Sequence, residues 1–184
     1  MNEPLPSLEV GVFTERLLQI IDEGARVATY KLALLLALMD CCATTSDRSG
    51  RAPSTLTTRE IAERVVEIYW PQTRPYVSGG SAVDLRQISA KRSAVLDAVT
   101  RLRSVAEEQG IQSLSRCRSA LAHDYDIAIQ SVELTFARYP IPLLQVVGRS
   151  PDPFIYDAEW DETITRRQLR AGAGVLTLRS GAGD

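Results

Sequence analysis

Hydrophobic positions recur with helical spacing through most of the chain. A first helix is predicted from Phe13 to Gly24, with a broad apolar face. Thr29 can cap a second helix, from Tyr30 to about Thr44. Its stretch Leu32–Met39 is apolar nearly all round, which is typical of a helix at the centre of a core rather than at the surface. We therefore expect a bundle built around this buried helix.

A capping box marks the start of a third helix. Thr57 and Glu60 have the spacing in which each side chain satisfies a backbone N–H of the other residue, which predicts a helix from Thr58 to about Tyr69. Pro71 ends it, and a Gly-containing connection without regular structure is expected over residues 72–85.

Helical spacing continues beyond that connection. A long helix is predicted from Ser89 or Ser93 to about Gln109, and a further helical region over residues 113–138, with a break near Ala122–Asp124. The Tyr-Pro-Ile-Pro segment 139–142 is expected to end it, because a residue before proline avoids the helical conformation.

The pattern changes in the last third of the chain. Three short strands are predicted at Leu143–Val147, Phe154–Asp157 and Val175–Leu178, with a polar helix at about Glu162–Arg170. Three short strands do not make an independent domain. The predicted fold is mainly α (α+β): a helical bundle around a buried central helix with a small C-terminal β-sheet. It forms a single domain over residues 1–184, with residues 1–9 as a loose lead-in.

Composition excludes several classes of protein. The chain of 184 residues is 45% hydrophobic and 24% charged, which is ordinary globular composition. The longest apolar run is too short to cross a bilayer, and no secretory signal opens the chain, so we expect a cytoplasmic protein without a membrane partner. One histidine excludes a two-histidine metal site and an HNH centre, and three cysteines without CxxC spacing are a poor zinc site. An acid–base pair that uses His123 is the alternative, but no nucleophile signature lies beside it. His123 is interpreted as a surface helix residue and the cysteines as buried thiols. We expect no enzyme activity, metal or cofactor.

Charge is distributed unevenly along the chain. The net charge is −2, yet residues 72–103 carry six basic residues against two acidic ones, a local balance of +4. Such polarity lets one face attract phosphate while the chain stays acidic overall. The alternative interpretation is that these arginines lie on solvated helix faces.

The segment from Arg74 to Arg92 is the first candidate site. Arg74 offers a planar fork of donors to phosphate oxygens or to guanine, and Gln87 can pair in a groove. Lys91 and Arg92 are expected near a helix N-terminus, where phosphate is favoured. A charged surface loop without a ligand remains the alternative.

A second candidate lies in the Tyr139-Pro140 turn, beside Arg138. The pair is interpreted either as a rigid turn or as a small apolar surface next to a cation. A winged-helix regulator is a further alternative, since a capped helix such as Thr58–Tyr69 often begins such modules. Against it, the next predicted helix begins some twenty residues later, whereas a helix-turn-helix needs a turn of about 3–4 residues.

Four segments together resemble a known family. They are FTERLLQIIDEGARVATYKLALLLALMD, LTTREIAERVVEIYWPQTRPY, LRQISAKRSAVLDAVTRLR and RYPIPLLQVVG. The combination resembles the DNA sulfur-binding domains of McrA-like type IV HNH restriction endonucleases, over nearly the whole chain. The resemblance implies binding of phosphorothioate double-stranded DNA, in which sulfur replaces a non-bridging phosphate oxygen. It also implies a fused HNH nuclease half, through which the protein would dimerise. The Gly-rich end SGAGD is expected to be a cut at a linker.

The resemblance also implies where the sulfur would lie. We expect Arg74, Pro75 and Tyr76 to form an apolar cup, Tyr139 and Pro140 its second wall, and Tyr30 and Lys31 to contact the backbone beside it. Flanking phosphates or bases would be held by four further residues: Arg86, Gln87, Lys91 and Arg92. Sulfur gains on the order of 1 kcal/mol from apolar contact, and an oxygen in the same cup loses roughly 1–3 kcal/mol of hydration. The expected preference is about a hundredfold.

Overall fold

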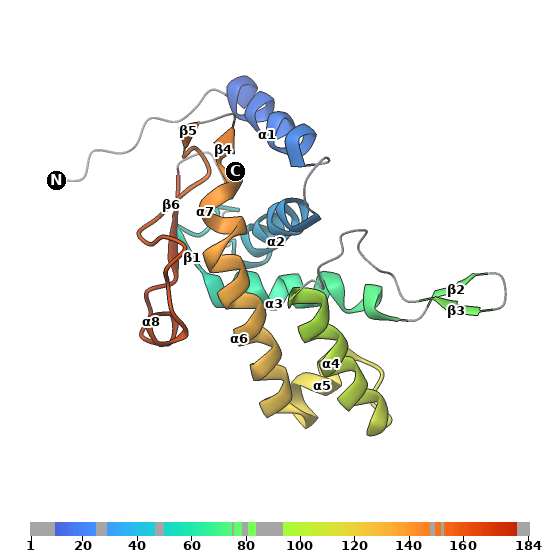
Figure 1. Cartoon of the computed structure of the whole chain (residues 1–184). Helices are drawn as coiled ribbons and strands as arrows, with labels where there is room; N and C mark the ends of the chain where they lie inside the picture. Colours follow the sequence, from blue (N-terminus) through green and yellow to red (C-terminus); the bar gives the residue numbers. More distant parts are fainter. Residues whose placement is uncertain are drawn as a thin grey trace.

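Helices form most of the structure and a small sheet flanks them (Figure 1). This computed structural model describes residues 10–24, 29–46, 50–74, 76–78, 81–83, 94–147, 150–151 and 153–179. The helices are α1 (Val10–Gly24), α2 (Thr29–Thr45), α3 (Thr58–Tyr69), α4 (Ala94–Glu108), α5 (Leu114–Ala120), α6 (Ala122–Arg138), α7 (Pro140–Leu144) and α8 (Arg166–Arg170), with a 3-10 turn η1 (Pro71–Thr73). The mainly α fold with a small sheet is confirmed.

The core lies where α3 meets its neighbours. Helix α3 packs against α2 on one side and α6 on another, and α6 also packs against α4. The inward residues of α3 are fully buried, among them Ile61, Ala62 and Val65. Helix α2 packs against α1, α3 and α7, which bury Leu34 and Ala37, while Leu36 and Met39 stay exposed.

Local signals at the helix ends are confirmed. The Thr57 side chain accepts a hydrogen bond from the N–H of Glu60, and the Glu60 carboxylate accepts one from the N–H of Thr57 at 2.7 Å. Pro71 follows α3 and opens η1. The predicted break in the later helical region falls at Leu121, between α5 and α6.

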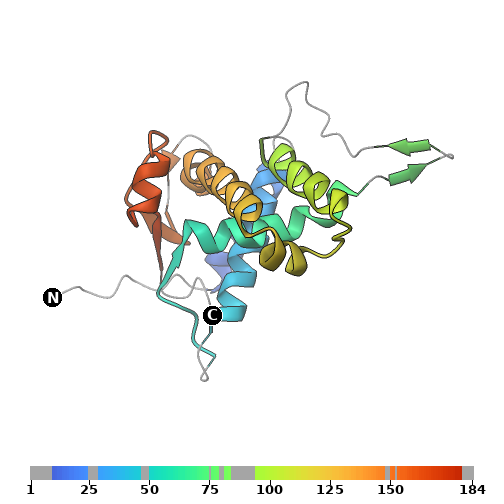
Figure 2. The same ribbon diagram turned by 90° about the horizontal axis from the view of Figure 1, so that it is seen from below.

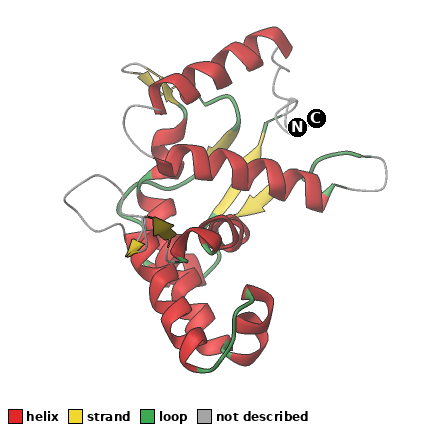
Figure 3. Cartoon of the chain, turned by 90° about the vertical axis from the view of Figure 1, so that its right-hand side faces the viewer, coloured by secondary structure: helices red, strands yellow, loops and turns green. Residues whose placement is uncertain are grey.

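One sheet is antiparallel with the order β1-β7-β6: β1 (Thr55–Thr57), β7 (Val175–Leu178) and β6 (Tyr156–Ala158). Leu56 and Leu176 are paired and buried, while their strand neighbours are exposed, as alternation requires. Strand β1 was not predicted because its threonines belong to the capping signal of α3. Figure 3 shows this sheet set among the helices.

The strand predicted at Leu143–Val147 is largely wrong. Residues Pro140–Leu144 form the short helix α7, and β4 (Val146–Val147) pairs with β5 (Ser150–Pro151) in a separate two-stranded ladder. Pro140 stands at the first position of α7, where its missing N–H costs nothing and its fixed φ suits a helix. The Tyr-Pro pair therefore ends α6 but starts another helix.

The connection after α3 contains a hairpin, where no regular structure was predicted. Strand β2 (Tyr76–Ser78) pairs antiparallel with β3 (Ser81–Val83). Figures 1 and 2 show the hairpin projecting away from the helices, on the side opposite to the sheet β1-β7-β6. No helix in the described part of the chain is long and apolar enough to span a membrane.

Candidate nucleic-acid interface

The base of the hairpin is a rigid turn attached to α4. Arg103 of α4 is 4% exposed, and its guanidinium carbon lies 4.0 Å from the centroid of the Trp70 ring. Its Nε donates to Oγ1 of Thr73 at 2.6 Å, and its Nη2 donates to the Trp70 carbonyl. A cation over an indole with two hydrogen bonds to one turn fixes that turn against the helix. Arg103 therefore determines where η1 lies.

The sequence of η1 completes the turn. The Thr73 hydroxyl donates to the Trp70 carbonyl at 2.9 Å, and the Arg74 N–H donates to the Pro71 carbonyl at 3.3 Å. The side chains of Pro71 and Arg74 are exposed. A rigid apolar ring and a guanidinium thus stand at the two ends of one turn, immediately before the hairpin.

Positive charge gathers at this turn. Burial lowers the pKa of the Arg103 guanidinium, and the nearby charge of Arg74 lowers it further, while Glu107, 3.8 Å from Arg103, opposes the shift. Within the described residues Arg74 has no side-chain hydrogen bond or ion pair. An exposed guanidinium beside a buried one favours an anion at this position.

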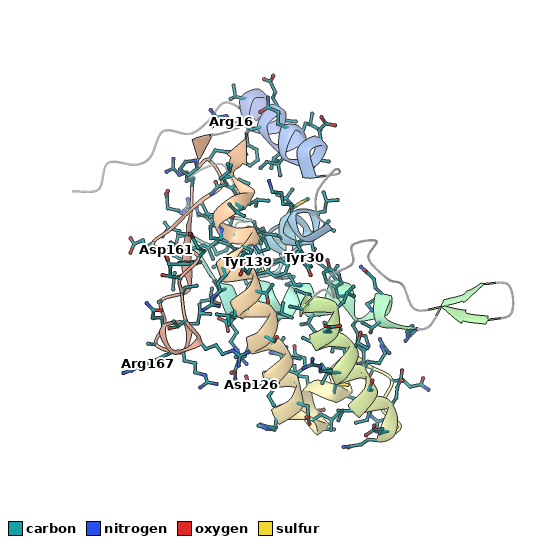
Figure 4. All side chains as sticks on the ribbon, viewed as in Figure 1. Arg16, Tyr30, Asp126, Tyr139, Asp161 and Arg167 are labelled. Carbon is teal, nitrogen blue, oxygen red and sulfur yellow. The ribbon has the colours of Figure 1, made fainter. Side chains whose placement is uncertain are left out.

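The structure separates the two expected walls of the sulfur cup. Turn η1, which precedes Arg74, packs against α3 and α4, whereas α7 packs against α6 and α2. Figure 4, drawn in the same view as Figure 1, shows Tyr139 well away from the hairpin β2–β3. Tyr139 is 59% exposed, but Pro140 is buried, so its ring cannot line an open cup. The elements that carry the two walls therefore have different main packing partners.

The remaining predicted residues fall into two groups. Tyr30 is half-buried, and its ring lies 6.5 Å from Tyr69 and 5.9 Å from Phe136, between centroids, so it joins α2, α3 and α6 in the core. Lys31, next to it, is half-buried. Five others lie outside the described residues: Pro75, Arg86, Gln87, Lys91 and Arg92. For Tyr76 only the backbone, in β2, is described.

Sequence reasoning missed the role of Arg103. By sequence it is one of the six basic residues of the segment 72–103, and no motif indicates a partner for it. Its spacing carried a signal, because Arg103 follows Val99 by four positions and lies on the same buried face as Leu102 and Ala106. A charged residue on an apolar helix face indicates a buried polar partner.

Helix α3 does not open a helix-turn-helix. Its surface is tied to α6 and α5 by Arg59–Asp126 at 2.7 Å and Arg118–Glu63 at 3.0 Å, and α2 covers another side. The helix described next, α4, begins at Ala94. A turn of about 3–4 residues, as a helix-turn-helix needs, does not follow α3.

The thiols and His123 show no arrangement for chemistry. All three cysteines are free, and burial raises the pKa of the Cys41 thiol to about 11, which disfavours the reactive thiolate. Cys117 is also buried, whereas Cys42 is half-buried. His123 is exposed on α6. Among the described residues no group of His, Cys, Asp and Glu could hold a metal ion.

The chain was compared with known families, curated proteins and solved structures. Residues 11–176 match the model of a domain of unknown function, DUF8808. No curated protein and no solved structure matches the chain. The match covers nearly all the helices and both outer strands of the sheet, so the chain belongs to the DUF8808 family.

Proposed function

We propose that this chain binds double-stranded DNA through the hairpin β2–β3 and the turn η1 at its base. The observation that carries the proposal is the combination of a projecting two-stranded ribbon with an exposed arginine, Arg74, on a turn that Arg103 and Trp70 hold in place. The ribbon would supply groove contacts and the turn phosphate contacts.

The size of the ribbon supports this assignment. The major groove of B-DNA, about 12 Å wide, admits a two-stranded β-ribbon. A two-stranded hairpin is at best marginally stable in water by itself. Strands β2 and β3 pair with one another and not with the sheet β1-β7-β6. The hairpin is therefore separate from that sheet and could enter a DNA groove.

Charge supports a phosphate contact at the base of the hairpin. Arg74 lies beside the buried Arg103, and repulsion between the two guanidinium groups is relieved when an anion binds Arg74. Arginine binds a phosphate through two parallel hydrogen bonds, which also fixes its orientation. The chain would thus place the ribbon in register on the duplex before any base is read.

We propose further that a phosphorothioate is the preferred ligand, as the family resemblance in the sequence implies. The exposed Pro71 ring at the other end of the η1 turn from Arg74 supports this, because sulfur is less well hydrated than oxygen and favours an apolar neighbour. The chain would act as a binding module that directs a fused HNH nuclease half to modified DNA.

Titration of the whole chain against a short duplex tests the DNA-binding claim. The wild type should bind with an affinity that falls with salt, and Arg74→Gln should make the slope of log affinity against log salt shallower by about 0.9, the value for one phosphate contact. Arg116→Gln, at an exposed arginine of α5, is the matched control and should leave the slope unchanged. An unaltered slope for Arg74→Gln would remove Arg74 from the interface.

A further inference from the structure

Helix α8 is a short helix held firmly on the body of the protein. The Thr165 hydroxyl accepts a hydrogen bond from the N–H of Gln168, and the Gln168 carboxamide oxygen accepts one from the N–H of Thr165 at 2.9 Å. Leu169 is buried with Ala137 and Ile164. A capped helix anchored by one apolar residue presents its other side chains in fixed directions.

Those other side chains form an arginine face, made of Arg166, Arg167 and Arg170. All three are exposed. At about 100° per residue they lie within an arc of about 100° on the helix surface. Figure 4 shows Arg167 extending outward from α8.

None of the three arginines forms a direct ion pair with a carboxylate within the described residues, although the hydrogen bond from Arg59 and, to a lesser extent, the charge of Arg170 lower the pKa of Asp126. Arg170 donates to the neutral Oε1 of Gln130 at 2.6 Å. By contrast, Arg179 and Arg59 form ion pairs with Asp157 and Asp126, each at 2.7 Å. Three guanidinium groups so close together repel one another unless an anion lies between them.

The turn that leads into α8 contains the carboxylate of Asp161. Asp161 accepts hydrogen bonds from the N–H and the hydroxyl of Thr163, at 2.8 and 2.6 Å. These bonds hold the Asp161 carboxylate to its own turn, which leads into α8. The hydrogen bonds of Asp161 are therefore made within this turn and not to the arginine face.

Helix α8 and the hairpin lie at two ends of one side of the molecule. Figure 2 shows α8, α6, α4 and the hairpin β2–β3 following one another across that side. Helices α6 and α4 pack together between them. A straight duplex that contacts the hairpin can extend along this side toward α8.

We propose that the arginine face of α8 binds the phosphate backbone of the same duplex, away from the hairpin. This inference rests on the proposed function. The partner is the phosphate backbone, which is the same for every sequence. The guanidinium groups of α8 supply charge for phosphate contacts, but α8 is a single helical turn and too short to enter a groove. Contact at α8 lengthens the bound stretch of DNA without adding sequence preference.

The test combines salt titration with hydroxyl-radical footprinting of the whole chain on a duplex of 30 base pairs. Arg166→Gln/Arg167→Gln should make the salt slope shallower by about 1.8, for two lost phosphate contacts, and should shorten the footprint at one end. Arg167→Gln should change the slope by about half as much. Arg116→Gln is again the control for loss of an exposed helical arginine, and should change neither quantity.

The outcomes separate this inference from the proposed function. If the double variant keeps the wild-type slope and footprint while Arg74→Gln weakens binding, the α8 contact is wrong and the hairpin contact stands. If the double variant shows both the shallower slope and the shorter footprint while Arg74→Gln binds as the wild type does, the α8 contact stands and the hairpin contact is wrong. Absence of DNA binding by the wild type overturns both. Binding of the double variant to polyglutamate is measured as well. If this variant binds DNA as the wild type does but no longer binds polyglutamate, α8 contacts an acidic protein and the inference is overturned.

Discussion

Arg103 lies with its guanidinium carbon 4.0 Å from the centroid of the Trp70 ring and donates a hydrogen bond to the Trp70 carbonyl. Trp70 ends α3, before the hairpin, and Arg103 belongs to α4, after it. This contact joins the two ends of the segment that carries the hairpin, so the hairpin emerges from a closed base.

Loss of this contact should destabilise the protein. Arg103→Met keeps the length of the side chain but leaves the Trp70 carbonyl without the Arg103 donor, and should lower the free energy of unfolding by about 2–3 kcal/mol. Chemical denaturation measures this free energy of unfolding. Arg101→Met, at an exposed position of the same helix, should change the value by less than about 0.5 kcal/mol. Similar values for both variants would contradict the bracing role of Arg103.

A close approach at Gly174 should make it intolerant of any side chain. A Cβ there would lie 2.2 Å from Oγ1 of Thr58. Thr58 cannot turn away freely, because its hydroxyl donates to Oε1 of the buried Glu133 at 2.7 Å and its N–H donates to the Gly174 carbonyl at 2.8 Å. Gly174→Ala should therefore lower the free energy of unfolding by about 2–3 kcal/mol.

The control for this variant is Gly11→Ala in α1, where no atom lies within 4 Å of an added Cβ. Alanine favours helix over glycine, so this change should leave the stability unchanged or raise it by up to about 1 kcal/mol. A Gly174→Ala protein as stable as the wild type in urea denaturation would show that the sheet and α3 are not locked together at this point.

Gln145 should be the most sensitive polar residue between the helices and the sheet. It is buried, and its Oε1 accepts hydrogen bonds from the N–H groups of Phe154 at 2.7 Å and Ile155 at 2.6 Å, while its Nε2 donates to the Tyr156 carbonyl at 2.8 Å. Gln145→Leu leaves these groups unpaired and should cost about 3 kcal/mol or more.

Thermal unfolding of Gln145→Leu, Gln145→Glu and the wild type checks this prediction. Gln145→Glu keeps the acceptor oxygen but places a second oxygen against the Tyr156 carbonyl, so it should also destabilise the protein. If only the acceptor oxygen contributed to stability, Gln145→Glu would be as stable as the wild type. A melting temperature of Gln145→Leu equal to that of the wild type would contradict the role of the amide.

The Arg59–Asp126 pair should give the stability a defined pH dependence. The hydrogen bond from Arg59 is the main cause that holds the pKa of Asp126 below its usual value, and burial opposes it. A folded-state pKa below the unfolded value of about 3.9 means that the pair stabilises the protein above that pH and loses its effect as pH falls toward the lowered pKa.

Stability measured from pH 6 to pH 2 in wild type and Asp126→Asn tests this dependence. The difference between them should be constant above about pH 5 and should shrink at lower pH. Arg59→Gln should remove the same pH-dependent part of the stability. The double variant Arg59→Gln/Asp126→Asn should lose no more of it than either single variant. A difference that does not depend on pH would contradict the pairing.

Much of the fold could be predicted from local sequence signals. The capping box at Thr57 and Glu60 depends on near neighbours, so the sequence contains it directly. Strand β1 could not be predicted in the same way, because its pairing with β7 joins residues more than a hundred positions apart. Pro140 was misread because the same residue that ends one helix is also the preferred first residue of the next.

The candidate site divides along the same line. Arg74 could be predicted as an exposed cation because it follows a helix stop and precedes a turn-rich segment. The position of Arg103 beside Arg74 and the burial of Pro140 could not be predicted, because both depend on how α4 and α7 pack against distant helices. The cup that joined Arg74 to Tyr139 assumed a proximity that the packing does not provide.

The most direct test of the proposed function is titration of the chain against two short duplexes that differ by one phosphorothioate, at two salt concentrations. A preference for sulfur that comes from apolar contact should survive at both, while the overall affinity falls with salt. Binding to the sulfur duplex should be at least about tenfold tighter at both salts, a difference of about 1.4 kcal/mol. Equal affinity for the two duplexes would contradict recognition of sulfur and leave a general DNA-binding module, and absence of binding to both would contradict the interface itself.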